Sequence, residues 1–456
     1  FIGIGGIGIS AVARMMLHDG KIVTGQDMQD SEIITELKKL GIDIKIGQSF
    51  ENIPKDVDLI VYTIAIDNYD PELAKKLKEP SKGGQAPEIP VKSYPEMLDL
   101  ISKDKYTIAI CGTHGKTTTT AMIAQIMRDN KKDPTVIVGS LLLDSNPPSH
   151  KATDGQRSNF IAGKSKYLIV EACEYRRSFL NINPKILVIT NIDADHLDYY
   201  KDIEDIKNAF HEFCMKVPED GFIICNPNDK YIADVIKASP VAGLRPRDVK
   251  AKVINYHDYF NKDLKLKIPG LHNKKDAAAA IAVGELVGIE KLDSEKAVMQ
   301  FPGTWRRFEF KAELKSGAKL YDDYAHHPTE IMTTLEGFRE IYSKQDGWKI
   351  TVVFHPHLFS RTKLLLNDFA KSFTDADRVL ILPIYYAREV DDGTISSKIL
   401  SDEINKSEDN KTSEAFESFE DLENKLKTEQ FGQKDIIITM GAGEAFKIGD
   451  WLMGFK

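Results

Sequence analysis

The sequence predicts an α/β protein built from three domains. Two glycine-rich segments, residues 3–8 and 112–118, each connect an apolar, strand-like run to a helical pattern. Nearer the C-terminus, strand candidates at 350–354, 378–382 and 435–439 alternate with helical patterns. Strands that alternate with helices predict mainly parallel sheets. A chain of 456 residues has room for about three such domains.

We place the first domain at residues 1–104 and expect it to be Rossmann-like. Gly3, Gly5 and Gly8 satisfy G-x-G-x-x-G, and Asp27 stands nineteen residues after the last of them. These glycines let a diphosphate approach a helix N-terminus, and the carboxylate suits a ribose. NAD is the usual ligand, but the diphosphate of a UDP-sugar has the same needs, and a turn without a ligand is the plainer alternative. The expected helix and strands are 10–18, 22–24 and 59–63.

The second domain, residues 105–309, holds the most informative segment. Residues 108–120 read Ile-Ala-Ile-Cys-Gly-Thr-His-Gly-Lys-Thr-Thr-Thr-Thr, and a helix is expected at 121–127. Such a loop cradles phosphate with backbone N–H groups, a lysine charge and a threonine that can hold Mg²⁺. Ile110 stands where the standard P-loop has glycine, so the loop is a variant; a plain turn with a solvated lysine is the alternative. We expect a P-loop-type ATPase domain with a mainly parallel sheet, whose nucleotide-binding residues are Gly112, Thr113, His114, Gly115, Lys116, Thr117 and Thr118.

Three other clusters of this domain can carry chemistry. Glu171 ends an apolar strand, where a carboxylate is placed to hold Mg²⁺, and Glu174 is a weaker candidate. Residues 190–198 gather Asn, Asp and His after another strand, which indicates a second metal position, a phosphate contact or a simple turn. Asn273 precedes an alanine-rich helix and is either its N-cap or an adenine contact.

The third domain, residues 310–456, is expected to be Rossmann-like. Arg306 and Arg307 lie just before it and can reach a phosphoryl group or form a structural salt bridge. Residues 322–330 read Asp-Asp-Tyr-Ala-His-His-Pro-Thr-Glu, a density of ionisable groups that a structural role alone explains poorly. Residues 354–362 add two further histidines and an arginine.

Composition excludes several function classes. The net charge is −8 and no Lys/Arg-rich block occurs, which argues against a nucleic-acid partner. The longest apolar runs are strand-sized, well short of the roughly 18–20 residues that span a bilayer. The cysteines have no metal-like spacing, so reduced thiols and a cytoplasmic location are expected. Polar or Pro/Gly-rich loops are expected at 79–90, 144–159 and 406–415.

Five motifs occur in order and together resemble the Mur ligases of peptidoglycan synthesis. They are Gly-Thr-His-Gly-Lys-Thr-Thr, Asn-Ile-Asp-Ala-Asp-His, His-Asn before the alanine run, Gly-Thr-x-Arg-Arg-Phe and Asp-Asp-Tyr-Ala-His-His-Pro-Thr-Glu. The resemblance covers nearly the whole chain. Within the family, the chain is most similar to members that join L-alanine to UDP-N-acetylmuramate.

The resemblance implies a role for each matching residue, with ATP and Mg²⁺ as cofactors. UDP-N-acetylmuramate would be bound by Gly5, Gly6, Gly8 and Asp27. ATP would be bound by the loop 112–118, Asn273, Arg307 and Asp323. Mg²⁺ would be held by Thr117, Glu171 and His196. L-alanine would be bound by Tyr324, His326 and Arg361. The catalytic residues would be Lys116, His196, Arg307, Asp323 and His326.

The implied reaction is amide formation through an acyl phosphate. ATP converts the lactyl carboxylate of UDP-N-acetylmuramate, a poor electrophile, to an acyl phosphate, while Mg²⁺ and Lys116 neutralise the phosphoryl charge. The amine of the amino acid then attacks, and the tetrahedral intermediate loses phosphate. His196 and His326 are the candidate bases.

The chain departs from the family pattern at three places. Asp276 stands where a second Asn is usual, and Leu358 replaces the first Arg of Pro-His-Arg-x-x-Arg. Cys173-Glu174-Tyr175-Arg176 replaces Asp-Glu-Ser-Asp. The loss of one Arg weakens carboxylate recognition, so the amino acid is less well defined than the reaction.

Three other functions stay open. The chain could attach a whole murein tripeptide to the same nucleotide, act as a nicotinamide-dependent oxidoreductase, or bind nucleotide as a regulator without catalysis. The oxidoreductase leaves Gly-Lys-Thr-Thr without a role, and the regulator leaves the metal and arginine residues without one. We expect no nucleic-acid or membrane partner, and a monomer or a homodimer.

Overall fold

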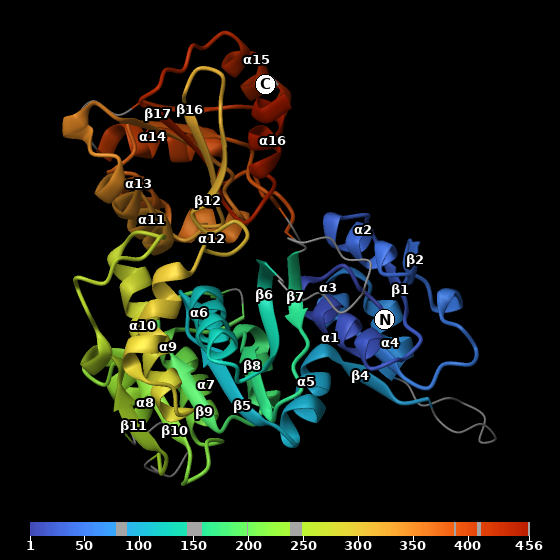
Figure 1. The fold of residues 1–456 in the computed structure, drawn as a ribbon. Coiled ribbons are helices and arrows are strands. Elements are labelled where there is room, and N and C mark those ends of the chain that lie inside the picture. Colours follow the sequence, from blue (N-terminus) through green and yellow to red (C-terminus); the bar gives the residue numbers. More distant parts are fainter. Residues whose placement is uncertain are drawn as a thin grey trace. The chain divides into compact units, whose positions relative to one another are not determined.

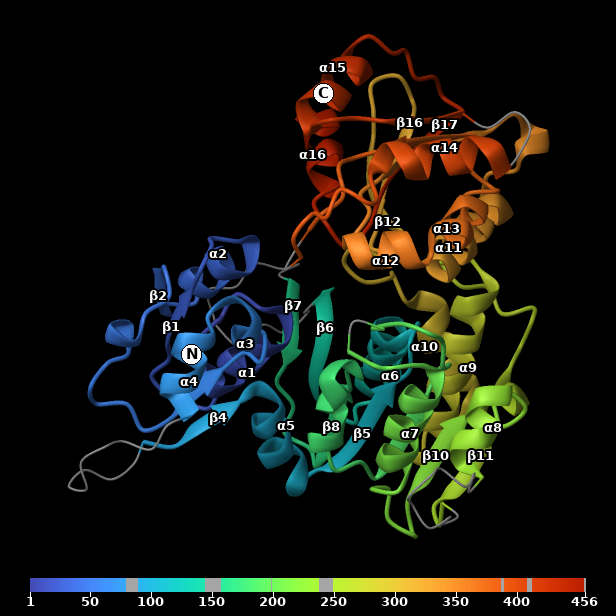
Figure 2. The same ribbon diagram turned by 180° about the vertical axis from the view of Figure 1, so that it is seen from behind.

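The protein folds into two compact units. A computed structural model describes residues 1–78, 89–143, 157–197, 199–237, 249–386, 389–407 and 412–454. Unit 1 comprises Phe1–Asn261 and Lys275–Val298, and unit 2 comprises Lys262–Lys274 and Met299–Lys456. Figures 1 and 2 show the elements of each unit from opposite sides.

The N-terminal part of unit 1 is a small parallel sheet with helices. Its strands are β1 (Thr24–Asp27), β2 (Asp43–Ile46), β3 (Ile60–Tyr62) and β4 (Val91–Ser93). β1 pairs with β2 and β3 with β4, and Ile2 forms parallel bridges to Gln26 and Tyr62 that join the two pairs. The helices are α1 (Ile7–His18), α2 (Glu32–Lys39), η1 (Phe50–Asn52), α3 (Ile66–Tyr69), α4 (Pro71–Lys78) and α5 (Tyr94–Lys103). The strand expected at 22–24 therefore begins only at its last residue.

The rest of unit 1 is built on a seven-stranded sheet of order β11-β10-β9-β5-β8-β6-β7. Every pairing is parallel except that of β6 with β7. The strands are β5 (Tyr106–Cys111), β6 (Thr135–Leu143), β7 (Arg157–Ile161), β8 (Tyr167–Glu171), β9 (Ile186–Ile189), β10 (Phe222–Cys225) and β11 (Lys252–Asn255).

Helices complete unit 1. They are α6 (Lys116–Asp129), η2 (Tyr175–Asn181), α7 (Ile203–Cys214), α8 (Lys230–Ile236), η3 (Tyr256–Tyr259), α9 (Leu271–Leu286), which begins in unit 2, and α10 (Lys291–Gln300), which ends there. α6 packs on β5, β6 and β8, and α1 packs on β6 and β7 (Figure 1). One buried cluster joins Val12 and Met97 from the N-terminal part with Phe160 of β7 and Phe210 of α7. The two parts of unit 1 therefore share a core.

The strands at the centre of this sheet end at a common edge. β5 pairs with β8 and with β9, so Ile110 faces Glu171 and Cys111 faces Ile189. These strands are continuous apolar runs because helices cover parallel strands on both faces. Ligands of open parallel sheets bind beyond the carboxyl ends of the strands, and that edge carries the residues after Cys111, Val170 and Ile189.

Unit 2 contains a six-stranded sheet of order β12-β13-β17-β14-β15-β16, parallel except for β12 with β13. Its strands are β12 (Glu309–Glu313), β13 (Lys319–Asp323), β14 (Lys349–Phe354), β15 (Arg378–Ile381), β16 (Thr412–Ala415) and β17 (Asp435–Met440). Its helices are α11 (Pro328–Ile341), η4 (Lys344–Asp346), α12 (Phe359–Leu364), α13 (Leu366–Ser372), α14 (Ser397–Ser407), α15 (Phe419–Lys427) and α16 (Phe446–Gly454). Residues of α11, α13 and α14 form one buried cluster and residues of α15 and α16 another, so helices cover both faces of the sheet (Figure 2).

The α/β class with mainly parallel sheets is confirmed, whereas the domain boundaries at 104 and 309 stay predictions. The loop expected at 406–415 is wrong at both ends, because α14 extends to Ser407 and Thr412–Ala415 form β16; residues 408–411 lie outside the described part. The loop at 144–159 is wrong for its last residues, since Arg157 starts β7; residues 144–156 lie outside the described part, as do 79–88 of the first expected loop.

Candidate active site

The glycine loop between β5 and α6 is shaped by two left-handed glycines. Gly112 has φ +134° and Gly115 has φ +81°. A Cβ on Gly112 would lie 2.0 Å from Thr190 Oγ1, and one on Gly115 would lie 2.6 Å from Asp276 Oδ1. Both positions therefore require glycine. Gly115 is also the N-cap of α6, so the helix starts at Lys116, ahead of the expected start at residue 121.

Lys116 is held inside this loop by a buried carboxylate. Its Nζ donates to the carbonyls of Gly112 (2.6 Å) and Thr113 (2.9 Å), and lies 3.1 and 3.0 Å from the two carboxylate oxygens of Glu174. Burial by itself lowers the pKa of Lys116, but the charges of Glu174 and Glu171 and the hydrogen bond to Glu174 together outweigh it, so the pKa is raised. Lys116 is therefore a fixed positive charge at the phosphate cradle. Glu174, which the sequence made the weaker candidate for the metal site, pairs directly with Lys116.

Thr117 and Glu171 form a pair of oxygen donors next to Lys116. Thr117 Oγ1 lies 3.0 Å from both carboxylate oxygens of Glu171, and one of these oxygens also accepts from the Gly139 amide at 2.8 Å. A hydroxyl and a carboxylate are ligands that Mg²⁺ prefers. The residues present fit that cation.

His196 lies beside Glu174. Its Nε2 is 3.6 Å from Glu174 Oε1, and its ring contacts Tyr175 with centroids 4.9 Å apart. Its backbone has φ +54°, a left-handed conformation that is costly for a residue with a side chain. The structure thus brings His196 to the same sheet edge as Lys116, Thr117 and Glu171.

The residues that follow β9 form hydrogen bonds with the glycine loop between β5 and α6. Asn191 accepts from the His114 amide and donates to the His114 carbonyl, both at 2.9 Å. Thr190 Oγ1 donates to the same carbonyl at 2.5 Å, and the Asp193 amide donates to Thr113 Oγ1 at 2.8 Å. Sequence reasoning missed this role of Thr190 and Asn191. The adjacency of β5 and β9 in the sheet was the missing information.

Asn273 and Asp276 stand near the start of α9. The side-chain amide of Asn273 donates to the Pro269 carbonyl one turn earlier, and Asn273 is buried. Asp276 is also buried, and its carboxylate occupies the position that a side chain on Gly115 would need. The departure from asparagine at position 276 therefore falls directly against the glycine loop.

The glycines of the N-terminal motif also lie in close contact with neighbouring side chains. A Cβ on Gly3 (φ +72°) would lie 2.3 Å from Thr63 Cγ2, and one on Gly8 would lie 2.7 Å from the Tyr94 ring. The Gly5 amide donates to Asp27 Oδ2 at 2.8 Å. Asp27 therefore fixes the backbone of the loop that precedes α1, in addition to any ribose contact.

In unit 2, the two neighbouring arginines differ in what they contact. Arg306 is 3% exposed, donates from Nε to Asp322 Oδ2 at 2.7 Å, and also donates to the carbonyls of Gly441 and Gly443. This is the structural salt bridge that the sequence left open. Arg307 is more exposed, with Nη1 3.8 Å from Glu330 Oε1.

Asp323 ends β13 and holds backbone on two sides. Its carboxylate accepts from the amides of Phe308 (2.7 Å) and Ala325 (2.8 Å). Burial raises the pKa of Asp323 to about 6, although the Arg307 charge and these hydrogen bonds act in the opposite direction.

The other expected residues of unit 2 form a cluster of rings and charges. His326 Nδ1 lies 3.2 Å from Glu330 Oε2, and its ring packs edge-on against Tyr324, with centroids 5.3 Å apart. Arg361 is 8% exposed, with Nη1 3.3 Å from His357 Nδ1, and the His326 and His357 rings are 6.1 Å apart. The structure brings Tyr324, His326 and Arg361 into one neighbourhood.

Leu358, which replaces an expected arginine, has an unusual backbone. It is 3% exposed and has φ +72°, and it precedes α12. Its carbonyl accepts from the Thr362 hydroxyl at 2.8 Å. A buried leucine in this conformation is strained, which is common where a backbone is held for binding.

Family models match three consecutive stretches of the chain. They are described as the Mur ligase family, catalytic domain, at residues 1–106, the Mur ligase middle domain at 110–284, and the Mur ligase, glutamate ligase domain at 306–443. Proteins named UDP-N-acetylmuramate–L-alanine ligase match over 99% of this chain and 96% of their own length, with 40% identity in Clostridium acetobutylicum and 41% in Clostridium tetani.

The chain belongs to the Mur ligase family. Among solved structures, the UDP-N-acetylmuramate-alanine ligase of Thermotoga maritima matches with a TM-score of 0.76 and 25% identity, covering 100% of this chain and 97% of that one. A murein peptide ligase of Psychrobacter arcticus has the same fold, with a TM-score of 0.70, 22% identity and the same coverage.

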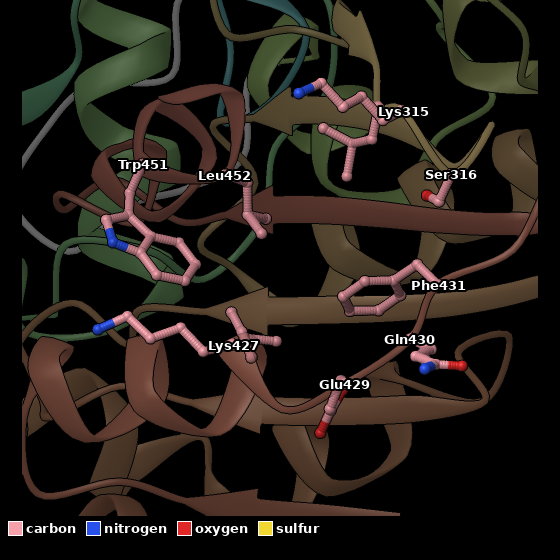
Figure 3. A pocket seen from close by; sticks show the side chains of 10 residues that line it. Lys315, Ser316, Lys427, Glu429, Gln430, Phe431, Trp451 and Leu452 are labelled. Atoms are coloured by element: carbon pink, nitrogen blue, oxygen red, sulfur yellow. The ribbon is translucent and has the colours of Figure 1, made fainter. Parts of the chain in front are cut away.

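This Mur ligase also has a pocket of about 450 Å³ within unit 2 (Figure 3). Trp451, Leu452, Phe431 and the stem of Lys427 surround it. None of the residues expected to bind substrate lines it. Within the described ranges, no helix is both long and apolar enough to cross a bilayer.

Proposed function

We propose that this Mur ligase joins L-alanine to the lactyl carboxylate of UDP-N-acetylmuramate, with ATP as the energy source and an acyl phosphate as intermediate. The observation that carries the proposal is the cluster of Lys116, Thr117, Glu171 and His196 at one sheet edge, in a chain 40% identical to enzymes named for this reaction. The proposed reaction belongs to peptidoglycan precursor synthesis, and the proposed location of the enzyme is the cytoplasm.

Each part of the cluster has a proposed task. Lys116 neutralises charge on the β- and γ-phosphates, and its raised pKa keeps it protonated at neutral pH. Thr117 and Glu171, with His196, hold Mg²⁺, which supplies charge neutralisation for phosphoryl transfer. Gly5, Gly6, Gly8 and Asp27 bind the diphosphate end of UDP-N-acetylmuramate. Asn273, Arg307 and Asp323 are proposed ATP contacts.

The amino acid is proposed to bind in unit 2. Arg361 offers the guanidinium for its carboxylate, and Tyr324 and His326 lie in the same cluster. Leu358 removes a second guanidinium from this neighbourhood. Recognition of the amino-acid carboxylate is therefore proposed to rest on Arg361. His326 is the proposed base for the amine, and His196 would take that role only in place of its role as a Mg²⁺ ligand.

Phosphate release tests the proposal. The protein is incubated with ATP, Mg²⁺ and UDP-N-acetylmuramate, and each of L-alanine, glycine, L-serine and the murein tripeptide is added separately. L-alanine is expected to give the highest kcat/KM. Stimulation by the tripeptide alone would assign the chain to the recycling reaction, and no stimulation by any of the four would overturn the ligase function.

A further inference from the structure

The turn after β8 contains two consecutive arginines in the left-handed conformation. Arg176 has φ 52° and ψ 29°, and Arg177 has φ 54° and ψ 25°. This conformation is unfavourable for a residue that carries a Cβ. The two side chains reach different parts of unit 1, and the turn begins directly after Glu174.

Arg176 reaches the N-terminal sheet. Its Nη1 donates to the Ile64 carbonyl at 3.0 Å, its Nη2 donates to Asn68 Oδ1 at 2.5 Å, and Asp67 Oδ2 lies 3.7 Å from Nη1. These three partners follow β3. A planar fork suits several oxygen acceptors at once, which an ammonium group matches poorly.

Arg177 instead contacts a helix that packs in the larger part of unit 1. It donates to Glu212 Oε1 at 2.7 Å and to Asp205 Oδ1 at 2.6 Å, and both acceptors belong to α7. The two arginines therefore share backbone strain and charge-assisted hydrogen bonds. They differ in whether their partners lie in the N-terminal part of unit 1.

The segment held by Arg176 touches the N-terminal glycine loop. The Thr63 amide donates to the Ile2 carbonyl at 3.0 Å. A Cβ on Gly3 would lie 2.3 Å from Thr63 Cγ2 and 3.3 Å from Tyr69 Oη. On the other side, two residues before Arg176, Glu174 contacts Lys116. In addition to the shared core, Arg176 is thus a direct polar link between the segment beside one glycine loop and the residues that hold the lysine of the other.

We propose that Arg176 is a positioning residue that sets the placement of bound UDP-N-acetylmuramate relative to the phosphates of ATP. This inference rests on the proposed function. The Arg176 fork fixes the segment 64–68 against the strand end that carries Glu171 and Glu174. Carboxylate and γ-phosphate must meet within a narrow geometry, so a loosened link lowers the rate and weakens productive sugar-nucleotide binding.

Four single variants test this inference. Arg176→Ala and Arg176→Gly both remove the fork, and the glycine also relieves the backbone strain. Arg176→Lys keeps one charge without the fork. Arg177→Ala is the matched control, because Arg177 has the same left-handed backbone but pairs with two carboxylates of α7, Asp205 and Glu212, rather than with the N-terminal part. Steady-state kinetics with UDP-N-acetylmuramate and ATP varied separately is combined with thermal unfolding.

Both fork-deleting variants are expected to lower kcat/KM for UDP-N-acetylmuramate between about tenfold and a hundredfold, with KM for ATP unchanged. Arg176→Lys should lie between them and the wild type. Arg177→Ala should lower the melting temperature with little change in kcat/KM. Equal kinetic constants for Arg176→Ala and Arg177→Ala would overturn the inference, as would a loss in Arg176→Ala that Arg176→Gly restores, because strain would then be the cause. A wild-type protein without turnover would instead contradict the proposed function.

Discussion

The buried pair of Lys116 and Glu174 makes a quantitative prediction. Glu174 is 3% exposed and contacts the lysine through both carboxylate oxygens, at 3.1 and 3.0 Å. Glu174→Gln keeps the size of the side chain and removes its charge. Lys116 is then left buried and charged without its counter-ion.

The magnitude follows from the surroundings of the lysine. Removing one partner of a buried pair costs about 3–5 kcal/mol. Lys116 retains the carbonyls of Gly112 and Thr113, and its side chain is 15% exposed, so the lower end, about 3 kcal/mol, applies. At about 2–4 °C for each kcal/mol, the variant should melt about 6–12 °C lower than the wild type. Phosphates of MgATP would replace the lost negative charge, so ATP should raise the melting temperature more in the variant than in the wild type.

Scanning fluorimetry with and without MgATP measures both effects. Glu212→Gln is the control, because Glu212 also pairs with an arginine, at 2.7 Å, but is 42% exposed. Its loss should cost no more than about 1 kcal/mol and should leave the ATP response unchanged. If Glu174→Gln melts like this control, or gains no additional stabilisation from ATP, the reasoning about the pair is refuted.

Three further predictions follow from the site. Lys116→Ala should lower kcat by at least about 100-fold, because the variant lacks the positive charge that neutralises the transferring phosphoryl group. Near-normal phosphate release would contradict this role of Lys116. Asp276→Asn removes a carboxylate that lies against Gly115 and should tighten ATP binding in calorimetry, so an unchanged Kd would show that this charge is not felt at the loop. Burial raises the pKa of Asp323 to about 6, so the contribution of Asp323 to the free energy of unfolding falls as pH rises from about 4 to 6. Burial lowers the pKa of His355 to about 4, so the contribution of His355 rises between about pH 4 and 6.5. The two nearly cancel, and Asp323→Asn should therefore make stability rise with pH by about 3 kcal/mol over this range; urea unfolding with the wild-type pH slope would be the contrary result.

Much of unit 1 could be predicted from local patterns. Residues 108–111 are all apolar, and the loop that follows contains glycine, lysine and threonine. A strand, a loop and a helix can therefore be predicted from this segment alone. Glu171 could be placed in the same way, because it directly follows an apolar run. The start of α6 at Lys116 was missed, since four consecutive threonines are weak helix formers and the glycine N-cap decides the boundary.

The remaining features depend on contacts between distant segments. Thr190 and Asn191 read as an ordinary turn, and their bonds to His114 exist because β9 is the neighbour of β5 in the sheet. Arg306 and Arg307 are adjacent in sequence, yet only the fold shows that Arg306 is buried against Asp322. The sequence predicts a loop where β16 forms, because an edge strand of four residues with mostly polar side chains has no clear alternation.

The bonds between Asn191 and both backbone groups of His114 have a kinetic consequence. A loop whose peptide groups are already fixed has no ordering step to complete when nucleotide arrives. Association should then proceed at a rate set by diffusion and orientation, and variants that weaken ATP binding should act mainly by shortening the lifetime of the complex. A substitution at Asn191 that frees the loop should do the opposite, and slow the arrival of ATP without removing any group that touches it.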